Sequence, residues 1–219
     1  MIDLHTHSLL SDGELLPSEL ARRAMVKGYK VIGISDHVDV TNIEHVVSSI
    51  LKLRDRLTYY KGITIVPGVE ITHVPKGLIK EVIACAKKLG VGYVVVHGET
   101  TAEPVEEGTN REAIDGGTHI LAHPGIITEE DVLRAKECGV LLEISARKGH
   151  SMSNGHVALL AKKIGAQLIF NTDAHSPSDL LTEAEAIKVI IGAGLSMDDF
   201  RIMQKNAFEL VQRILKEKK

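Results

Sequence analysis

The chain has few aromatic residues and almost no cysteine. Its 219 residues include three Phe, four Tyr, no Trp and two Cys. So few aromatic side chains argue against a surface that stacks nucleic-acid bases or anchors a protein partner. Two cysteines cannot form a disulfide framework, and we expect Cys85 and Cys138 to be small buried residues in helices. This usage fits a reducing cytoplasm, where we expect the protein to reside.

The chain also lacks an excess of basic charge and any long apolar run. Lys and Arg number 26 against 29 Asp and Glu, which gives a formal net charge of −3. Because no surplus of basic residues neutralises phosphates, nucleic acid is disfavoured as a partner, although a short oligonucleotide stays open. No stretch reaches the roughly 18 apolar residues of a membrane span, and no basic-then-apolar leader is present. We therefore expect a soluble protein without a membrane partner.

Short β-branched runs recur along the whole chain. Their starts lie about 20 to 33 residues apart, the length of a βα unit. Two of them are apolar at successive positions, which is typical of strands buried on both faces of a parallel sheet. The pattern predicts an α/β domain with either a closed parallel barrel or a doubly wound open sheet. The expected strands are Ile2–His5, Val31–Ser35, Ile63–Val69, Tyr93–His97, Thr118–Ala122, Val140–Ile144 and Leu168–Asn171.

Stretches of helical period fill the intervals between these runs. Pro17 suits the first turn of a helix and Gly28 suits its end, while Thr128 is expected to cap a helix with an acidic first turn. No tract rich in Pro, Ser or Gly divides the chain, so residues 1–219 are expected to form a single domain. The expected helices are Pro17–Gly28, Ile43–Tyr59, Leu78–Leu89, Thr128–Cys138, Ser153–Ile164, Ser178–Ile191 and Met197–Leu215.

Histidine is the one residue type in conspicuous excess, with 11 copies. Six histidines and three carboxylates lie at the ends of the expected strands or in the loops that follow. In a parallel α/β barrel the carboxyl ends of all strands open on one face, so these side chains should converge there. The nine residues are His5, His7, Asp12, His37, Glu70, His97, His123, Asp173 and His175.

The chemistry of these nine side chains predicts a metal centre. Side chains alternate along a strand, so His5 and His7 should point to the same side, and Asp173 and His175 repeat the spacing. Imidazole and carboxylate without thiolate suit zinc, manganese or iron better than magnesium or calcium. Nine ligands suit two or three divalent ions. Adjacent ions could share a bridging hydroxide, clamp the oxygens of a phosphate ester and attract that anion.

Other polar residues near the strand ends divide into substrate contacts and supporting groups. Arg147 is expected to grip phosphate oxygens together with Lys148, its alternative being a surface salt bridge. His156 is a further candidate substrate contact. Asp36 and Glu99 are expected to orient ligands, and Glu99 and a metal-bound water are the candidate general acids. The remaining histidines, expected to be solvated or hydrogen-bonded locally, are His45, His73, His119 and His150.

The ordered motifs resemble those of the polymerase-and-histidinol-phosphatase (PHP) superfamily. The resemblance extends from the second residue to about residue 180 and implies a distorted seven-stranded (β/α)7, TIM-barrel-like fold. It also implies a trinuclear metal centre that hydrolyses phosphoesters. The motifs are His5-Thr-His7, Ser-Asp12-Gly, Ser-Asp36-His37, Gly68-Val-Glu70, His97, Ala-His123-Pro-Gly and Thr-Asp173-Ala-His175.

The resemblance further implies how the ligands are shared among the ions. One ion would be held by His5, His7, Glu70 and Asp173, and a second by Asp12, His37 and His175. Glu70 would bridge to a third ion held by His97 and His123. Family members often have His where this chain has Asp12. Arg147 resembles the arginine with which the histidinol-phosphatase branch holds substrate phosphate.

Three functions follow as hypotheses. The favoured one is a metal-dependent phosphatase of a small phosphomonoester such as histidinol phosphate, with Asp173, Glu70, Arg147 and Glu99 as the catalytic residues. The second is a phosphodiesterase or 3′ exonuclease acting on nucleotides or nucleic-acid ends. The third is a non-catalytic scaffold subunit, which would be expected to lack ligands. The loops expected to set the substrate are Glu99–Gly117 and Arg147–Ser153; substrate, native metal and oligomeric state stay open.

Overall fold

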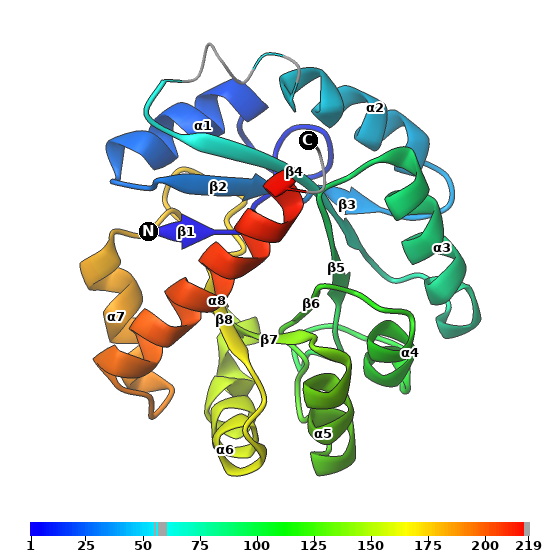
Figure 1. Ribbon diagram of the computed structural model, residues 1–219, viewed down its shortest axis with the longest axis vertical. Coiled ribbons are helices and arrows are strands. Elements are labelled where there is room, and N and C mark those ends of the chain that lie inside the picture. Colours follow the sequence, from blue (N-terminus) through cyan, green and yellow to red (C-terminus); the bar gives the residue numbers. More distant parts are fainter. Residues whose placement is uncertain (55, 57–60, 217–219) are drawn as a thin grey trace.

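A barrel of seven parallel strands forms the centre of the protein (Figure 1). The computed structural model describes residues 1–54, 56 and 61–216. The strand order is β1-β2-β4-β5-β6-β7-β8, and the short strand β3 pairs with β4 beside this path. The predicted barrel is thus confirmed and the open sheet excluded. The strands are β1 (Ile2–Asp3), β2 (Val31–Ile34), β3 (His37–Val38), β4 (Thr64–Ile71), β5 (Tyr93–His97), β6 (Ile120–Ala122), β7 (Leu141–Ser145) and β8 (Leu168–Asn171).

The segments that follow β1 and β8 bring the two ends of the sheet together. Thr6 forms a parallel bridge with Ala174. The Asp173 N–H donates a hydrogen bond to the His5 carbonyl at 2.9 Å. Strand β1 therefore ends at Asp3, earlier than expected, because the backbone of His5 pairs with the segment after β8. The barrel is closed by the same two segments that carry predicted ligands.

Helices surround the barrel (Figure 1). The helix expected from Ser178 begins only at Glu183, because Thr182 and Glu185 form a reciprocal capping box there. Thr128 caps its helix as predicted. Of the expected helix Ile43–Tyr59, residues 55 and 57–59 lie outside the described residues. The helices are α1 (Pro17–Val26), α2 (Ile43–Arg54), α3 (Lys76–Leu89), α4 (Thr109–Asp115), α5 (Glu129–Cys138), the 3-10 turn η2 (His150–Ser153), α6 (Asn154–Ile164), α7 (Glu183–Gly192) and α8 (Met197–Lys216).

Three short elements were not predicted: β3, α4 and η2. Strand β3 has two residues, too few to show a periodic pattern, and only its pairing with β4 defines it. Helix α4 lies within the segment Glu99–Gly117, which was expected to be a loop. Its first turn is held by Glu99, whose carboxylate accepts hydrogen bonds from the N–H groups of Gly108 and Asn110. A side chain ten residues upstream thus takes the place of a local helix cap.

Helix α8 closes the end of the barrel opposite the predicted site. Gln204 hydrogen-bonds the backbone of Ile2, and Asn206 donates to the Leu168 carbonyl, so α8 lies against the first residues of β1 and β8. Figure 1 shows α8 crossing this end. Its apolar side chains join the core inside the barrel, where Tyr93 is fully buried. The carboxyl ends of the strands are left for the functional site.

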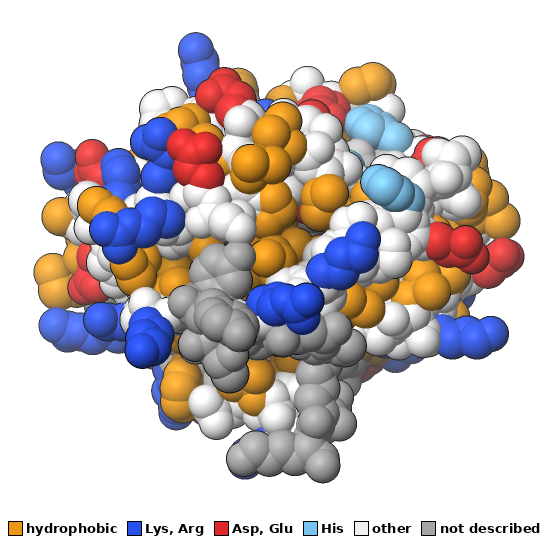
Figure 2. All heavy atoms as spheres, turned by 90° about the horizontal axis from the view of Figure 1, so that it is seen from above, with side chains coloured by type: hydrophobic (Ala, Val, Ile, Leu, Met, Phe, Trp, Pro, Cys, Tyr) orange, Lys and Arg blue, Asp and Glu red, His pale blue; other side chains and the backbone are white. Residues whose placement is uncertain are grey.

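Within the part of the chain that the structure describes, no helix is long and apolar enough to span a bilayer. Basic and acidic side chains are intermixed on the face drawn in Figure 2. Both cysteines are free; Cys85 is half-buried, but Cys138 is exposed. The expected burial of Cys138 was wrong, because it ends α5 beyond Val132 and Ala135, the residues through which that helix packs.

Candidate metal centre

All nine predicted ligands lie together at the carboxyl ends of the strands. Each offers a nitrogen or oxygen atom to at least one group of three or four such atoms, all within 4.8 Å of one another. Six of them line a cavity of about 410 Å³, while His5, His7 and Glu70 are fully buried and do not line it. The convergence predicted from the strand ends is therefore present in the fold.

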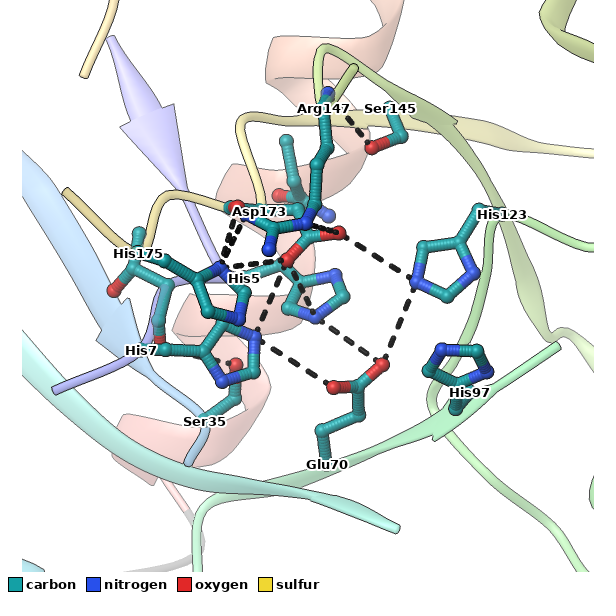
Figure 3. Close-up of polar contacts among 12 residues, drawn as sticks. His5, His7, Ser35, Glu70, His97, His123, Ser145, Arg147, Asp173 and His175 are labelled. Atoms are coloured by element: carbon teal, nitrogen blue, oxygen red, sulfur yellow. Dashed lines mark hydrogen bonds and ion pairs between the residues drawn. The ribbon is translucent and has the colours of Figure 1, made fainter. Parts of the chain in front are cut away.

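Two buried carboxylates lie at the centre of the donor cluster. Glu70, near the end of β4, has one oxygen 3.3 Å from His5 Nε2 and the other 3.6 Å from His7 Nε2. Asp173, after β8, lies 3.3 Å from His7 Nε2 and 3.6 Å from His123 Nε2. Figure 3 shows both carboxylates pointing into the space between His5 and His7 on one side and His123 on the other. Four strands thus direct charged or basic atoms at one small volume.

The backbone is strained where it delivers these side chains. Among the described residues, the non-glycine residues with positive φ are His73, His123 and Asp173, at 51°, 28° and 55°. Such conformations cost about 1–3 kcal/mol each and persist only where the surrounding structure enforces them. All three residues line the cavity. The strained backbone is therefore found at two predicted ligands, His123 and Asp173, and at His73 in the same cavity wall.

A second group of donors lies toward the solvent. One oxygen of Asp12 is 3.4 Å from His37 Nε2 and 3.2 Å from His175 Nε2. The His7 ring stacks between the other two imidazoles, with centroids 4.2 and 4.0 Å away. The loop that carries Asp12 is held by Asp36, which accepts hydrogen bonds from the backbone and hydroxyl of Ser8. Asp36 therefore has the supporting position expected of it.

Three carboxylates are buried in the donor cluster, and their charges shift the pKa values of neighbouring groups. Glu70, Glu143 and Asp173 are all buried. Burial opposes a charged His5, but the three carboxylates outweigh it and raise the pKa of His5 well above its usual range. Burial raises the pKa of Asp173 to about 7, a shift to which Glu70 and Glu143 add. These shifts show a site in which positive charge is needed to balance the carboxylates.

Several buried polar atoms of the cluster have no hydrogen-bond partner. They include Nε2 of His5, Nε2 of His7 and Oε1 of Glu70, whereas Oε2 of Glu70 lies 2.8 Å from His37 Nδ1. Leaving one such atom unpaired inside a protein costs about 1–3 kcal/mol. Imidazole nitrogens and carboxylate oxygens that face a common volume without hydrogen bonds are the donor set of a zinc, manganese or iron site. The residues present therefore fit the predicted divalent ions.

The other predicted site residues are not all at the cavity. Arg147 lines it, with Nη1 2.7 Å from His175 Nδ1 and donating to the Asp173 carbonyl at 3.3 Å. Lys148 instead lines a neighbouring cavity. The ring of His156 hydrogen-bonds the Ile127 carbonyl at 2.7 Å, and the Glu99 carboxylate holds the start of α4. Of these four residues, the fold brings only Arg147 to the donor cluster.

The fold adds residues that the strand-end pattern did not select. Glu143, inside β7, lies 2.8 Å from His5 Nδ1; an acid within an apolar strand run was the available signal. The local role expected for His150 was wrong, because η2 buries its ring against His123, with centroids 4.0 Å apart. His119 is satisfied locally as predicted, its Nδ1 accepting from the Val94 N–H. His73 lines the cavity although its side chain is exposed.

Comparison with known proteins identifies the family of this chain. A model of the PHP domain matches residues 3–217. The chain belongs to the PHP domain family. An uncharacterized protein of Methanocaldococcus jannaschii is 44% identical over 196 residues, which cover 89% of this chain and 90% of the relative. A probable phosphatase of Thermoanaerobacter is 28% identical over an alignment that covers 100% of this chain and 96% of the relative.

A solved phosphatase structure has the same fold. The histidinol phosphate phosphatase of Lactococcus lactis, in complex with zinc, L-histidinol and phosphate, superposes with a TM-score of 0.62. The alignment covers 89% of this chain and 94% of the phosphatase, at 17% sequence identity. At this identity the similarity establishes the shared barrel, and the chemistry of this PHP protein rests on its own side chains.

Proposed function

We propose that this PHP protein is a metal-dependent phosphatase of small phosphomonoesters, using two or three divalent ions of zinc, manganese or iron. The observation that carries the proposal is the placement of nine imidazole and carboxylate donors around one cavity with Arg147 in its wall. A cavity of about 410 Å³ has the size of a small-molecule site. The names of the Thermoanaerobacter and Lactococcus proteins support the same class of reaction.

The predicted ligands divide into a buried group and a group nearer the solvent. His5, His7, Glu70 and Asp173 would hold ions at the buried centre, and Asp12, His37 and His175 would hold one nearer the solvent. When bound, divalent ions supply Lewis acidity and a water nucleophile at neutral pH. Glu143 fixes the ring of His5, and Asp36 fixes the loop of Asp12. These supports keep the donors in place without reorganisation during the reaction.

Arg147 is the residue proposed to recognise the substrate. Its guanidinium is partly exposed at the cavity wall and carries more N–H donors than its contacts with His175 and Asp173 use. A planar guanidinium can donate two parallel hydrogen bonds to the oxygens of a terminal phosphate. Lys148, His156 and Glu99 have no part in this proposal, because the fold directs them elsewhere.

The test compares three esters with the same protein preparation. Protein loaded with zinc or manganese is assayed on histidinol phosphate, a nucleoside monophosphate and an activated phosphodiester. We expect a monoester to be preferred and Arg147→Ala to lower kcat/KM for it by about 10²-fold or more, the loss of roughly 3 kcal/mol of charge-assisted contact. Arg147→Lys keeps the charge without the two-pronged geometry and should recover only part of the activity.

Two results would contradict the proposal. If the diester is preferred and Arg147→Ala does not change kcat/KM for it, the phosphodiesterase or exonuclease hypothesis would be favoured. Turnover that persists in fully folded Asp173→Asn protein after metal loading would contradict the assigned centre. Metal content is measured for every variant, since Arg147 also contacts His175 and its replacement could act through that ligand.

A further inference from the structure

A second cavity borders the metal centre on the side of β4 and β5. It has a volume of about 160 Å³ and lies beneath the loop that joins β5 to α4. His73 and His97 line both this cavity and the larger one, so the two are neighbours. In Figure 3, His97 lies at the edge of the donor cluster, apart from His5 and His7. The loop belongs to the segment Glu99–Gly117, which was expected to set the substrate.

The walls of this cavity are apolar and lie outside the barrel. Glu70 and His97 point into the barrel mouth, so Ile71 and Val96, their neighbours along β4 and β5, point outward. There they meet Ile79 of α3 in the core between the strands and the helices, each only 1% exposed. The aliphatic lining consists of Ile71, Val74, Ile79, Val96 and Val105.

The loop over the cavity is held at the start of α3. The Glu106 carboxylate accepts a hydrogen bond from the Lys76 N–H at 3.0 Å, and the Lys76 ammonium donates to the Glu107 carbonyl at 3.1 Å. Pro104, directly before Val105, has a fixed φ. A wall that is already held in place loses little conformational entropy when a ligand binds, which favours affinity.

The size and chemistry of the cavity define what fits it. A volume of about 160 Å³ has room for about five non-hydrogen atoms, taking roughly 30 Å³ for each as for a water molecule in the liquid. Glu106 and Thr109 are its polar neighbours besides the histidines, and the Glu106 carboxylate is already bonded to Lys76. A polar group placed among the aliphatic side chains would lose hydrogen bonds to water, whereas an apolar group gains by leaving water.

Two exposed side chains lie at the boundary between the cavities. Glu103 is 3.0 Å from His73 Nε2 and 3.2 Å from His97 Nε2. The side chains of His73 and Glu103 are 43% and 40% exposed, so both can turn toward solvent without opening the barrel. His97 is buried and stays in place. A group attached to a phosphate at the metal centre can therefore pass beside His97 once His73 and Glu103 separate.

We propose that this cavity is a subsite for a compact apolar group on the alcohol part of the phosphomonoester. The proposal rests on the phosphatase function and names its substrate class: esters whose alcohol carries a branched alkyl chain or a small ring of about five non-hydrogen atoms. The phosphate lies at the donor cluster and Arg147, and the alcohol extends outward between β4 and β5. Val105 and its loop then select the alcohol, while Arg147 recognises the phosphate.

The test measures binding without turnover. Methyl-, propyl- and pentylphosphonate, which carry no ester bond to hydrolyse, are titrated into zinc-loaded full-length protein by calorimetry. We expect the Kd to fall about threefold to fourfold for each added methylene, the usual gain for burying one. Replacing the last methyl group of pentylphosphonate with a hydroxyl keeps its length and should raise the Kd by about tenfold or more.

Three variants locate the apolar group. Val105→Phe should fill the cavity and abolish the dependence of Kd on chain length. Val105→Thr keeps the size of the side chain, adds a hydroxyl to the wall and should weaken that dependence, which covers the case in which Val105→Phe does not fold. The matched control is Val26→Phe, the same change at an exposed valine at the end of α1, which should bind all three phosphonates as wild type does.

The outcomes separate this subsite from the phosphatase function. A Kd that does not change with chain length, or a dependence that both Val105 variants leave intact, would overturn the subsite, as would failure of every phosphonate to bind. Binding that tightens with chain length in a protein that hydrolyses no ester would support the subsite and contradict the proposed phosphatase. Hydrolysis of alkyl phosphates with a kcat/KM independent of chain length would contradict the subsite alone.

Discussion

The Glu143 carboxylate lies 2.8 Å from Nδ1 of His5, and both side chains are fully buried. Asn171 donates to the same carboxylate oxygen at 2.8 Å, so Glu143 is itself held in place. With the hydrogen of His5 on Nδ1, its Nε2 points toward Glu70 and Asp173. A carboxylate behind a ligating histidine fixes the ring and increases its basicity.

Replacing Glu143 should therefore weaken metal binding without unfolding the protein. We expect Glu143→Gln to raise the Kd for zinc at the centre about 10- to 100-fold, the effect usual for groups behind a metal ligand. The measurement is calorimetric titration of the stripped protein. Glu137→Gln removes the same charge from the exposed face of α5 and serves as the control. Equal affinities of Glu143→Gln and wild type would mean that the contact does not serve metal binding.

Removal of metal should destabilise the fold. The buried Asp173 carboxylate lacks sufficient compensation without cations, as its raised pKa of about 7 indicates. A ligand that binds only the native state at 100 times its Kd adds about 2.7 kcal/mol of stability. We expect zinc to raise the Tm of chelator-treated protein, and Glu70→Gln to shrink that rise. Thermal melts with and without zinc measure it, with Asp198→Asn on α8 as the control. If zinc did not change the Tm, metal binding would not stabilise the fold and this prediction would be wrong.

The loop of Asp12 should depend on Asp36. Asp36 accepts hydrogen bonds from the Ser8 N–H at 2.7 Å and from the Ser11 hydroxyl at 2.8 Å. We expect Asp36→Ala to free this loop and lower zinc occupancy at Asp12, His37 and His175, while the buried centre stays loaded. Asp36→Asn keeps an acceptor for the Ser8 N–H and should be affected less. Identical zinc counts in Asp36→Ala and Asp36→Asn would show that the loop does not need this support.

Protonation of His119 should destabilise the protein in mild acid. Burial, with the charges of Lys87 and Arg213 adding to it, lowers the pKa of His119 to about 4. The neutral ring accepts the Val94 N–H, a bond that protonation breaks. The unfolded state, with a pKa near 6.5, binds the proton first, so this stability is present above about pH 6.5 and is lost as pH falls toward 4.

The size of this effect is measurable by denaturation. Between pH 7.5 and pH 5 the loss should be about 1–2 kcal/mol in the free energy of unfolding, from 1.4 kcal/mol per pKa unit. His119→Asn keeps an acceptor for the Val94 N–H but does not titrate, so its stability should fall less over the same range. Urea melts at both pH values give the comparison. Parallel pH slopes in the two proteins would contradict this assignment.

Local patterning determined the parallel strands and the donor set of this protein, and the resemblance to the PHP motifs selected the barrel over an open sheet. Seven β-branched runs at βα spacing specify parallel strands, because each run can be buried only between helices. A parallel barrel opens all carboxyl strand ends on one face, so residues that follow strands, such as His7, Glu70 and His123, must meet. These features were available from the sequence because each depends on periodicity and on one rule of topology.

Only the tertiary structure decided which neighbours complete the site. Glu99 and Glu103 lie four residues apart on one loop, yet the first holds the start of α4 and the second faces the histidines. His150 joins His123 because η2 folds back over the cavity, and Glu143 reaches His5 across the barrel. Such contacts join residues up to 138 positions apart. No local pattern encodes them, because loop conformation is set by the packing of the whole chain.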